Sequence, residues 1–199
     1  MRNNIKPDHD SHYNPSCFYD KGTHFEVLEA LNSEIERNDE YFSIEHHIQK
    51  YGGKMPLWVI VELLSFSSLS KLYTAMYKND QDVIASFANT TRELLVNHLH
   101  CLSNLRNKCA HMVRLYNTPY NNPAKLKVGL MRKNPAVQMS SLFAYILVLL
   151  SNLADFNSRN LLIVDLTTTI EKYSEYIDFD LIRLPSNYAD LMKQYSGLT

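Results

Sequence analysis

The chain has 199 residues, 45% of them hydrophobic, which is enough for one folded domain with a substantial core. Its 20 basic residues nearly balance its 21 acidic residues, and five glycines and seven prolines argue against a disordered or β-rich chain. The N-terminus lacks the apolar segment of a signal peptide, and the longest apolar run, Leu142–Leu150, is far shorter than the roughly 20 residues that span a bilayer, so we expect a cytoplasmic protein that makes no membrane contact.

The first part of the chain predicts helices after an irregular start. Residues 1–22 are polar and contain prolines, so no regular element is expected there. From Phe25 onward, hydrophobic residues recur at steps of three and four and predict a helix. A second helix is expected over about 43–51, with Gly52 and Gly53 at its C-cap.

A single long helix is expected next. Pro56 is tolerated in its first turn, and the apolar pattern continues to about Tyr77. Its buried side is predicted to hold Val59, Leu63, Phe66, Leu69, Leu72, Tyr73 and Met76. A short helix, capped by Asp80 or Asp82, then ends before Asn89.

The rest of the chain predicts a central helix, a long connection and an apolar C-terminal part. A threonine followed by acidic Glu93 is typical of a helix N-terminus, and this helix is expected over about 91–115. The connection at 116–135 contains three prolines and is not a continuous helix; connections of this length are often functional. Further helices are expected at about 137–156, broken by Asn157 and Ser158, at 161–176 and at 187–196. The predicted fold is an all-α bundle in which residues 23–199 form a single domain.

The central helix is predicted to have two different faces. The polar face on a helical wheel holds Asn97, His100, Asn104, Asn107, His111 and Arg114. The apolar face holds Leu94, Leu95, Leu102, Leu105, Cys109, Met112 and Val113, with His98 as a core histidine. A stripe of amides and imidazoles without glutamate indicates a surface that self-associates or reads a polar ligand; a merely solvated face is the alternative.

Charge is distributed unevenly around this helix. No acidic residue lies between Glu93 and Asp155, whereas seven basic residues do: Arg106, Lys108, Arg114, Lys125, Lys127, Arg132 and Lys133. The rest of the chain holds 13 basic and 21 acidic residues. A strongly basic segment in a near-neutral chain indicates a polyanionic partner.

Two blocks of this sequence resemble a known family. One is Pro-Leu-Trp-Val-Ile-Val-Glu at 56–62, followed by Ser65-Phe66 and Leu72-Tyr73. The other is Leu-Arg-Asn-Lys-Cys-Ala-His-Met-Val-Arg-Leu-Tyr-Asn at 105–117. Over roughly residues 20–180, the chain resembles the Abi-like group of bacterial abortive-infection proteins in the HEPN superfamily, and we expect it to lack the further N-terminal helical region of those proteins. The resemblance implies a HEPN-like helical bundle with a long basic loop after the motif helix.

The resemblance also implies a function. It implies a metal-independent endoribonuclease without a cofactor, in abortive infection and phage defence or as a toxin. Arg106, Asn107 and His111 match the family motif and would be catalytic. The residues expected to hold RNA are Arg114, Lys108, Asn104, Lys125, Lys127, Arg132 and Lys133. The site would form where two HEPN units meet, so the expected partners are RNA, a second copy of the chain, and an antitoxin or small RNA.

The residue types fit RNA cleavage. The 2′-hydroxyl of RNA is the nucleophile, and histidine takes or gives a proton near neutral pH. Arginine offers a fixed fork of donors to phosphate, and Asn107 could orient His111 or hold a phosphate oxygen. One histidine cannot easily act as base and acid on opposite sides of phosphorus, whereas a twofold dimer supplies a second His111. Whether His111 is the acid or the base stays open.

Other interpretations are kept beside this one. The chain could be a non-catalytic RNA-binding or scaffold protein, or an interaction module whose polar stripe is a dimer seam. Tyr116 and Tyr120 either stack on bases or pack against the bundle. Two groups of potential metal ligands lack recognisable spacing, namely Asp8, His9, Asp10 and His12, and Glu45, His46 and His47. Cys17, Cys101 and Cys109 are expected to be reduced thiols, and Met131, Met139 and Met192 to lie in the core.

Overall fold

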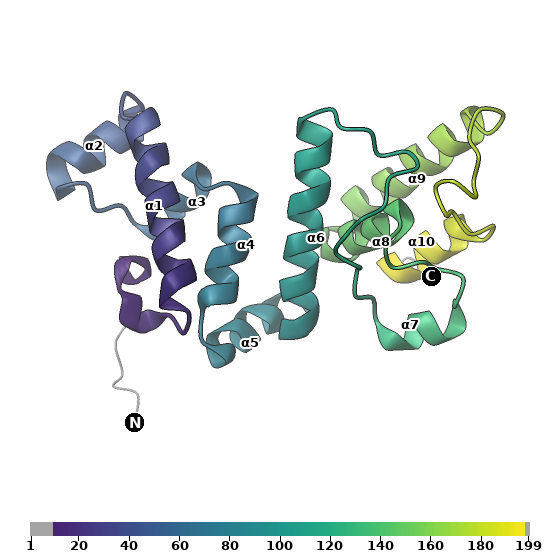
Figure 1. Ribbon diagram of the computed structural model, residues 1–199, viewed down its shortest axis with the longest axis horizontal. Helices are drawn as coiled ribbons and strands as arrows, with labels where there is room; N and C mark the ends of the chain where they lie inside the picture. The colour runs from purple at the N-terminus through teal and green to yellow at the C-terminus, as the bar shows by residue number, and fades with distance from the viewer. Residues whose placement is uncertain (1–9, 198–199) are drawn as a thin grey trace. The chain divides into compact units, whose positions relative to one another are not determined.

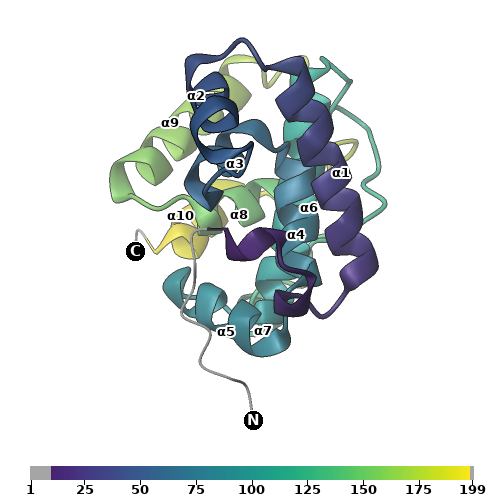
Figure 2. The same cartoon turned by 90° about the vertical axis from the view of Figure 1, so that its left-hand side faces the viewer.

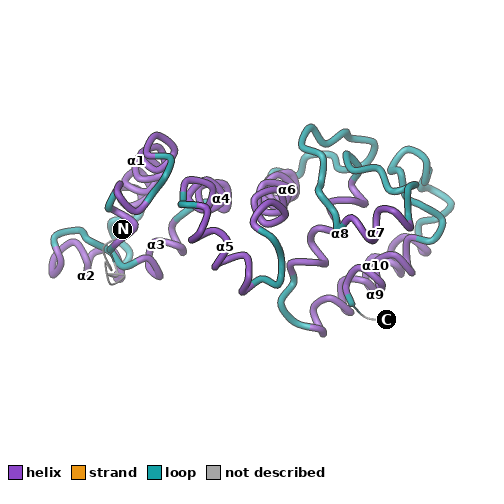
Figure 3. The backbone as a smooth tube through the Cα atoms, turned by 90° about the horizontal axis from the view of Figure 1, so that it is seen from below, coloured by secondary structure: helices purple, strands orange, loops and turns teal. Residues whose placement is uncertain are grey.

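The structure is a computed structural model that describes residues 10–197, and this part of the chain is built from helices (Figure 1). Within it there are ten α-helices, two short 3₁₀ turns and no strand, which confirms the predicted all-α class (Figure 3). The chain divides into two compact units, Met1–Arg92 and Glu93–Thr199. That residues 23–199 act as one domain stays a prediction.

The first unit contains five helices around its own core. After 3₁₀ turns at Ser11–Tyr13 and Pro15–Cys17 come α1 (Lys21–Arg37), α2 (Phe42–Tyr51), α3 (Leu57–Leu63), α4 (Phe66–Ala75) and α5 (Lys78–Phe87). Helix α1 packs mainly against α4 and also contacts α3 (Figure 2). Val27 and Leu31 of α1, Ile44 of α2 and Ile60 of α3 are all buried in this core.

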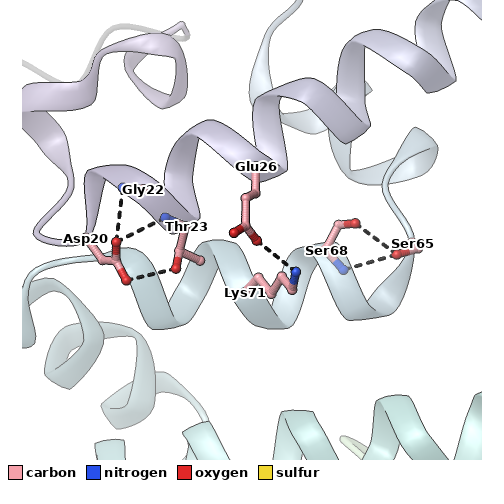
Figure 4. A network of polar contacts seen from close by, with 7 residues as sticks. All are labelled: Asp20, Gly22, Thr23, Glu26, Ser65, Ser68 and Lys71. Atoms are coloured by element: carbon pink, nitrogen blue, oxygen red, sulfur yellow. Dashed lines mark hydrogen bonds and ion pairs between the residues drawn. The ribbon is translucent and has the colours of Figure 1, made fainter.

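Side-chain caps set where α1 and α4 begin (Figure 4). The Asp20 carboxylate accepts hydrogen bonds from the backbone N–H groups of Gly22, at 3.1 Å, and Thr23, at 3.0 Å. Hydrogen bonds from Thr23 and Gly22 hold the pKa of Asp20 below its ordinary value.

Helix α4 is capped in the same way and is also paired with α1. Ser65 Oγ accepts from the Ser68 N–H at 3.1 Å, and the Lys71 ammonium pairs with the Glu26 carboxylate of α1 at 3.1 Å. Each cap satisfies donors that a helix leaves unpaired in its first turn.

The structure corrects several predicted boundaries in the first unit. The helix expected over 56–77 is two helices, because Leu64 and Ser65 are extended and Ser65 caps a new one. The short helix after it has Tyr77 at its N-cap position, so neither aspartate is its cap. The first helix begins at Lys21, before Phe25 where the apolar pattern starts, so it overlaps the segment 1–22 in which no regular element was expected. The predicted helix over 43–51 is confirmed by α2, which ends at Gly52 in the left-handed conformation.

The second unit is organised around an apolar helix. It contains α6 (Arg92–Ala110), α7 (Val128–Lys133), α8 (Leu142–Asn152), α9 (Phe156–Lys172) and α10 (Tyr188–Ser196). Six side chains of α8 are buried, and α10 packs against both α8 and α9. Met192 is buried, and Met131 and Met139 pack against the same core, as predicted.

Boundaries in the second unit also differ from the prediction. The central helix ends at Ala110 rather than near 115, and the connection contains α7. The helix expected over 137–156 is the shorter α8, which begins after its cap Ser141. The break is not at Asn157 and Ser158, because Asp155 accepts from the Ser158 N–H at 2.8 Å and starts α9 there.

Truncation of the central core residue of α8 tests this organisation. Leu147 is fully buried, so Leu147→Ala is expected to lower the free energy of unfolding by ~2–5 kcal/mol through lost transfer energy and a residual cavity. The matched control is Leu161→Ala on α9, because Leu161 is 61% exposed. Chemical denaturation of both variants measures the difference, and equal losses would contradict the packing described.

Candidate functional site

The second sequence block lies where α6 ends in a chain reversal. The Val113 N–H donates to the Lys108 carbonyl at 2.9 Å, and the Met112 N–H donates to the Cys109 carbonyl at 3.2 Å. This pair of bonds is the Schellman pattern, in which the residue after the helix adopts the left-handed conformation. Met112 has that conformation, with φ of 51°. His111 is therefore the last residue before the chain turns away.

Arg106 and Asn107 lie in the last turns of α6, and His111 follows directly after its last residue, Ala110. The Arg106 guanidinium donates to the side-chain oxygen of Asn107 at 3.1 Å. The His111 N–H donates to the Asn107 carbonyl at 3.0 Å, which places His111 one helical turn beyond Asn107. Arg106 and His111 are exposed, and Asn107 is half-buried. Arg114 lies past the reversal, so the predicted stripe does not extend to it.

The N-terminal half of α6 holds the connection that follows. The Asn97 amide donates to the Pro123 carbonyl at 3.0 Å, and its oxygen accepts from the Lys125 N–H at 2.7 Å. The His98 Nε2–H donates to the Lys125 carbonyl at 2.8 Å. Two adjacent side chains thus bind both backbone groups of Lys125. We call Asn97 and His98, together with the Pro123 and Lys125 backbone groups that they bind, the α6 clamp.

Beneath the clamp lies a buried polar network. Cys101 donates to the Asn97 oxygen at 3.6 Å and accepts from the Asn122 amide at 3.2 Å. Tyr145 of α8 donates to the Asn122 carbonyl at 2.7 Å. Burial raises the pKa of Tyr145, although hydrogen bonds from Asn104 and Asn122 oppose that shift. Asn97, which was expected on the polar ligand-facing stripe, is instead 8% exposed and structural.

His98 is the core histidine that the sequence predicts. It is 3% exposed. Asn152 donates to its Nδ1 at 2.9 Å, and its Nε2–H donates to the Lys125 carbonyl. The Asn152 amide also donates to the Val148 carbonyl at 2.7 Å, which fixes that amide as a donor. Both ring nitrogens are thus satisfied in the neutral form. Burial lowers the pKa of His98 below 6.5.

Five basic side chains that were expected to hold RNA are exposed, namely Arg114, Lys125, Lys127, Arg132 and Lys133. Lys108 is half-buried, with its ammonium 5.3 Å from the centroid of the Tyr120 ring. Asn104 is half-buried beside Tyr145. The clamp fixes the backbone from which the Lys125 side chain projects, whereas Arg132 and Lys133 project from α7.

For Tyr116 and Tyr120 the structure favours packing against the bundle over stacking on bases, and it corrects the predicted apolar face of the central helix. Tyr120 is 3% exposed and packs against Tyr145, with ring centroids 4.2 Å apart, so it cannot stack on a base from solvent. The Tyr116 hydroxyl accepts from the Asp178 N–H at 3.0 Å and so packs within the unit. Cys109, Met112 and Val113, which were assigned to the apolar face, are all exposed: Cys109 lies in the last turn of α6, and Met112 and Val113 follow the end of the helix.

The structure also bears on metal and membrane binding. In residues 10–197, no group of three histidine, cysteine, aspartate or glutamate side chains is placed to hold a metal ion. Asp8 and His9 of the first candidate group lie outside the described residues, and His12 is buried. Nor does this range contain a helix with the length and apolar character to cross a bilayer.

The reversal at Met112 predicts a stabilising substitution. Met112 is 94% exposed and adopts a conformation that glycine reaches without the steric cost of a Cβ atom. Met112→Gly is therefore expected to raise the free energy of unfolding by about 1 kcal/mol. Met112→Ala keeps the strained Cβ and should leave stability nearly unchanged in the same denaturation experiment. A destabilised glycine variant would contradict the reversal.

The α6 clamp predicts a pH dependence. Because the pKa of His98 is lowered by folding, the unfolded chain binds more protons below 6.5, and stability is lost as pH falls through that range. His98→Gln keeps a donor for the Lys125 carbonyl but does not titrate. The free energy of unfolding, measured from pH 7.5 to 5.0, should fall less steeply in this variant, and parallel curves would contradict the assignment.

Comparison with known proteins identifies a family. The model of the Abi-like protein family matches residues 1–117, which is more than half of the chain and contains both sequence blocks. Residues 118–180, for which a resemblance was also expected, lie outside this match. No curated protein and no solved structure matches the chain. The chain therefore belongs to the Abi-like protein family, and this membership suggests a function in abortive infection.

Proposed function

We propose that the protein is a metal-independent endoribonuclease of the HEPN type that acts in abortive infection, with Arg106, Asn107 and His111 as its catalytic residues. The observation that carries this proposal is the exposed end of α6. There Arg106 contacts Asn107 at 3.1 Å, and the His111 backbone bonds to Asn107 one turn later.

The charge around this helix end supports a phosphodiester ligand. Between Glu93 and Asp155 the chain has seven basic residues and no acidic one. A segment with this excess of positive charge attracts a polyanion, and each neutralised phosphate adds to the salt dependence of binding. The Lys125 side chain projects from a backbone that the α6 clamp holds, so it can contact RNA without first ordering the loop.

Arg106 is suited to bind the scissile phosphate. One guanidinium nitrogen already donates to Asn107, and this contact orients the planar fork. The remaining N–H groups can donate to the phosphate oxygens, where charge develops as the 2′-oxygen attacks phosphorus. The attack breaks the bond to the 5′-oxygen, so the products carry a 2′,3′-cyclic phosphate and a 5′-hydroxyl.

The proton transfers require two groups. One takes the proton from the 2′-hydroxyl, and the other gives a proton to the leaving 5′-oxygen on the opposite side of phosphorus. Each chain supplies one His111, and its exposed position at the end of α6 leaves it accessible to a second copy. A homodimer with twofold symmetry would place two Arg106 and two His111 side chains in one site. An antitoxin or small RNA would act by occupying that site.

Mutation of His111 tests the proposal. With single-stranded RNA in EDTA, His111→Ala is expected to lower the cleavage rate by at least about 100-fold, because general acid–base catalysis contributes that much. His100→Ala is the matched control, since His100 is an exposed histidine on the same helix and should leave the rate unchanged.

The substrate and product ends separate this mechanism from others. DNA of the same sequence lacks the 2′-hydroxyl and should remain intact, and the cleaved RNA should carry 5′-hydroxyl ends. DNA cleavage, or loss of RNA cleavage on chelation, would contradict the mechanism. Salt-dependent RNA binding without cleavage by the wild type would instead support the non-catalytic RNA-binding alternative.

A further inference from the structure

The first unit contains an open pocket that the proposed ribonuclease chemistry does not use. It lies between α2 and the segment that leads into α3, and its volume is about 910 Å³. Helices α2 and α3 face the viewer in Figure 2. The pocket is lined by two sequence features to which the proposed function gives no role, namely the His46-His47 pair and the Pro-Leu-Trp block at 56–58. Pockets of roughly 300–1,000 Å³ are typical of small-molecule sites.

Five rings form a continuous wall in this pocket. Along α2, the Phe42 and His46 rings lie 6.2 Å apart, and the His47 and Tyr51 rings lie 5.5 Å apart. The Trp58 ring of α3 lies 6.2 Å from that of His47. Phe42 is 84% exposed, and Trp58 is 64% exposed. Large exposed rings gathered on one concave surface are typical of a binding site rather than of a solvated face.

The floor of the pocket belongs to the core of the first unit. Met55 is fully buried, and Val59 is 5% exposed. The Met55 N–H donates to the Tyr13 hydroxyl at 3.4 Å. Gly52 and Gly53, both with positive φ, turn the chain so that Trp58 comes back beside α2. The rings of the wall therefore project from a backbone that is anchored in this core.

A polar pair stands beside the rings. The Lys54 ammonium lies 3.5 Å from the Asp10 carboxylate, and both side chains line the pocket. They present a donor next to an acceptor. A bound organic cation is disfavoured, because Lys54 already neutralises the only carboxylate among the pocket-lining residues that the structure describes. A purely apolar ligand would leave both groups without a new partner.

We propose that this pocket binds a purine base. A purine has a flat face that stacks on exposed aromatic rings, and its edge carries adjacent donors and acceptors that match Asp10 and Lys54. The base could belong to a free nucleotide or to single-stranded RNA, since both present the same chemistry. The inference does not depend on the ribonuclease proposal, because it concerns other residues in the other unit.

The chain provides its own probe for this test, because Trp58 is its single tryptophan. Titration of the full chain with AMP and with GMP should quench Trp58 fluorescence saturably, while ribose 5-phosphate should leave it unchanged. Tyr51→Ala is expected to weaken binding by about tenfold, as for loss of one stacking ring. Phe87→Ala on α5, which removes an 83% exposed ring outside the pocket, should not weaken it.

Further titrations identify the source of the base and define the results that would contradict the proposal. Oligoadenylate that binds far more tightly than AMP assigns the base to RNA, and equal affinity assigns it to a free nucleotide. Asp10→Asn should change the preference between AMP and GMP, because the carboxylate reads the edge of the base. Quenching by none of these probes, or equal quenching by N-acetylphenylalaninamide, would overturn the assignment.

Discussion

The fold of the second unit depends on hydrogen-bond partners for the backbone of its long connection. Residues 111–127 belong to no helix, so their N–H and carbonyl groups need partners from elsewhere. Asn97 and His98 supply them at Pro123 and Lys125, and both lie on a rigid helix. A further contact with α6 comes from the Asn122 amide, which donates to Cys101. The exposed Lys125 owes its backbone placement to the α6 clamp.

The clamp explains why the polar stripe on α6 has two parts with different roles. Near the start of the helix, Asn97 faces the connection, and its side-chain amide is hydrogen-bonded to the backbone of Pro123 and Lys125. Near its end, Arg106 and His111 are exposed. The same residue types therefore stabilise the fold in one half and remain accessible to a ligand in the other. Backbone strain at Met112, immediately after His111, is the kind of feature that clusters at functional sites.

Periodicity predicted most helices but not their junctions. Two consecutive helices keep the same spacing of apolar residues, so the pattern continued through Leu64 and Ser65 although the chain is extended there. A helical wheel places side chains on faces but contains no information about what packs on each face. It therefore assigned Asn97 to the ligand side and Cys109 to the core, and the structure reverses both. His98 was predicted correctly because a lone imidazole among leucines is more often a satisfied core residue than a ligand.

The two candidate sites use different physical forces, and this difference constrains what each can recognise. The basic segment after α6 acts on phosphates through net charge, a force that salt screens and that carries no base preference. The pocket on α2 and α3 offers ring faces and one neutralised ion pair, so it gains little from the charge of a nucleic acid. Stacking and edge contacts instead distinguish one base from another. A protein with both sites could therefore bind RNA generally through one unit and respond to a particular base or nucleotide through the other.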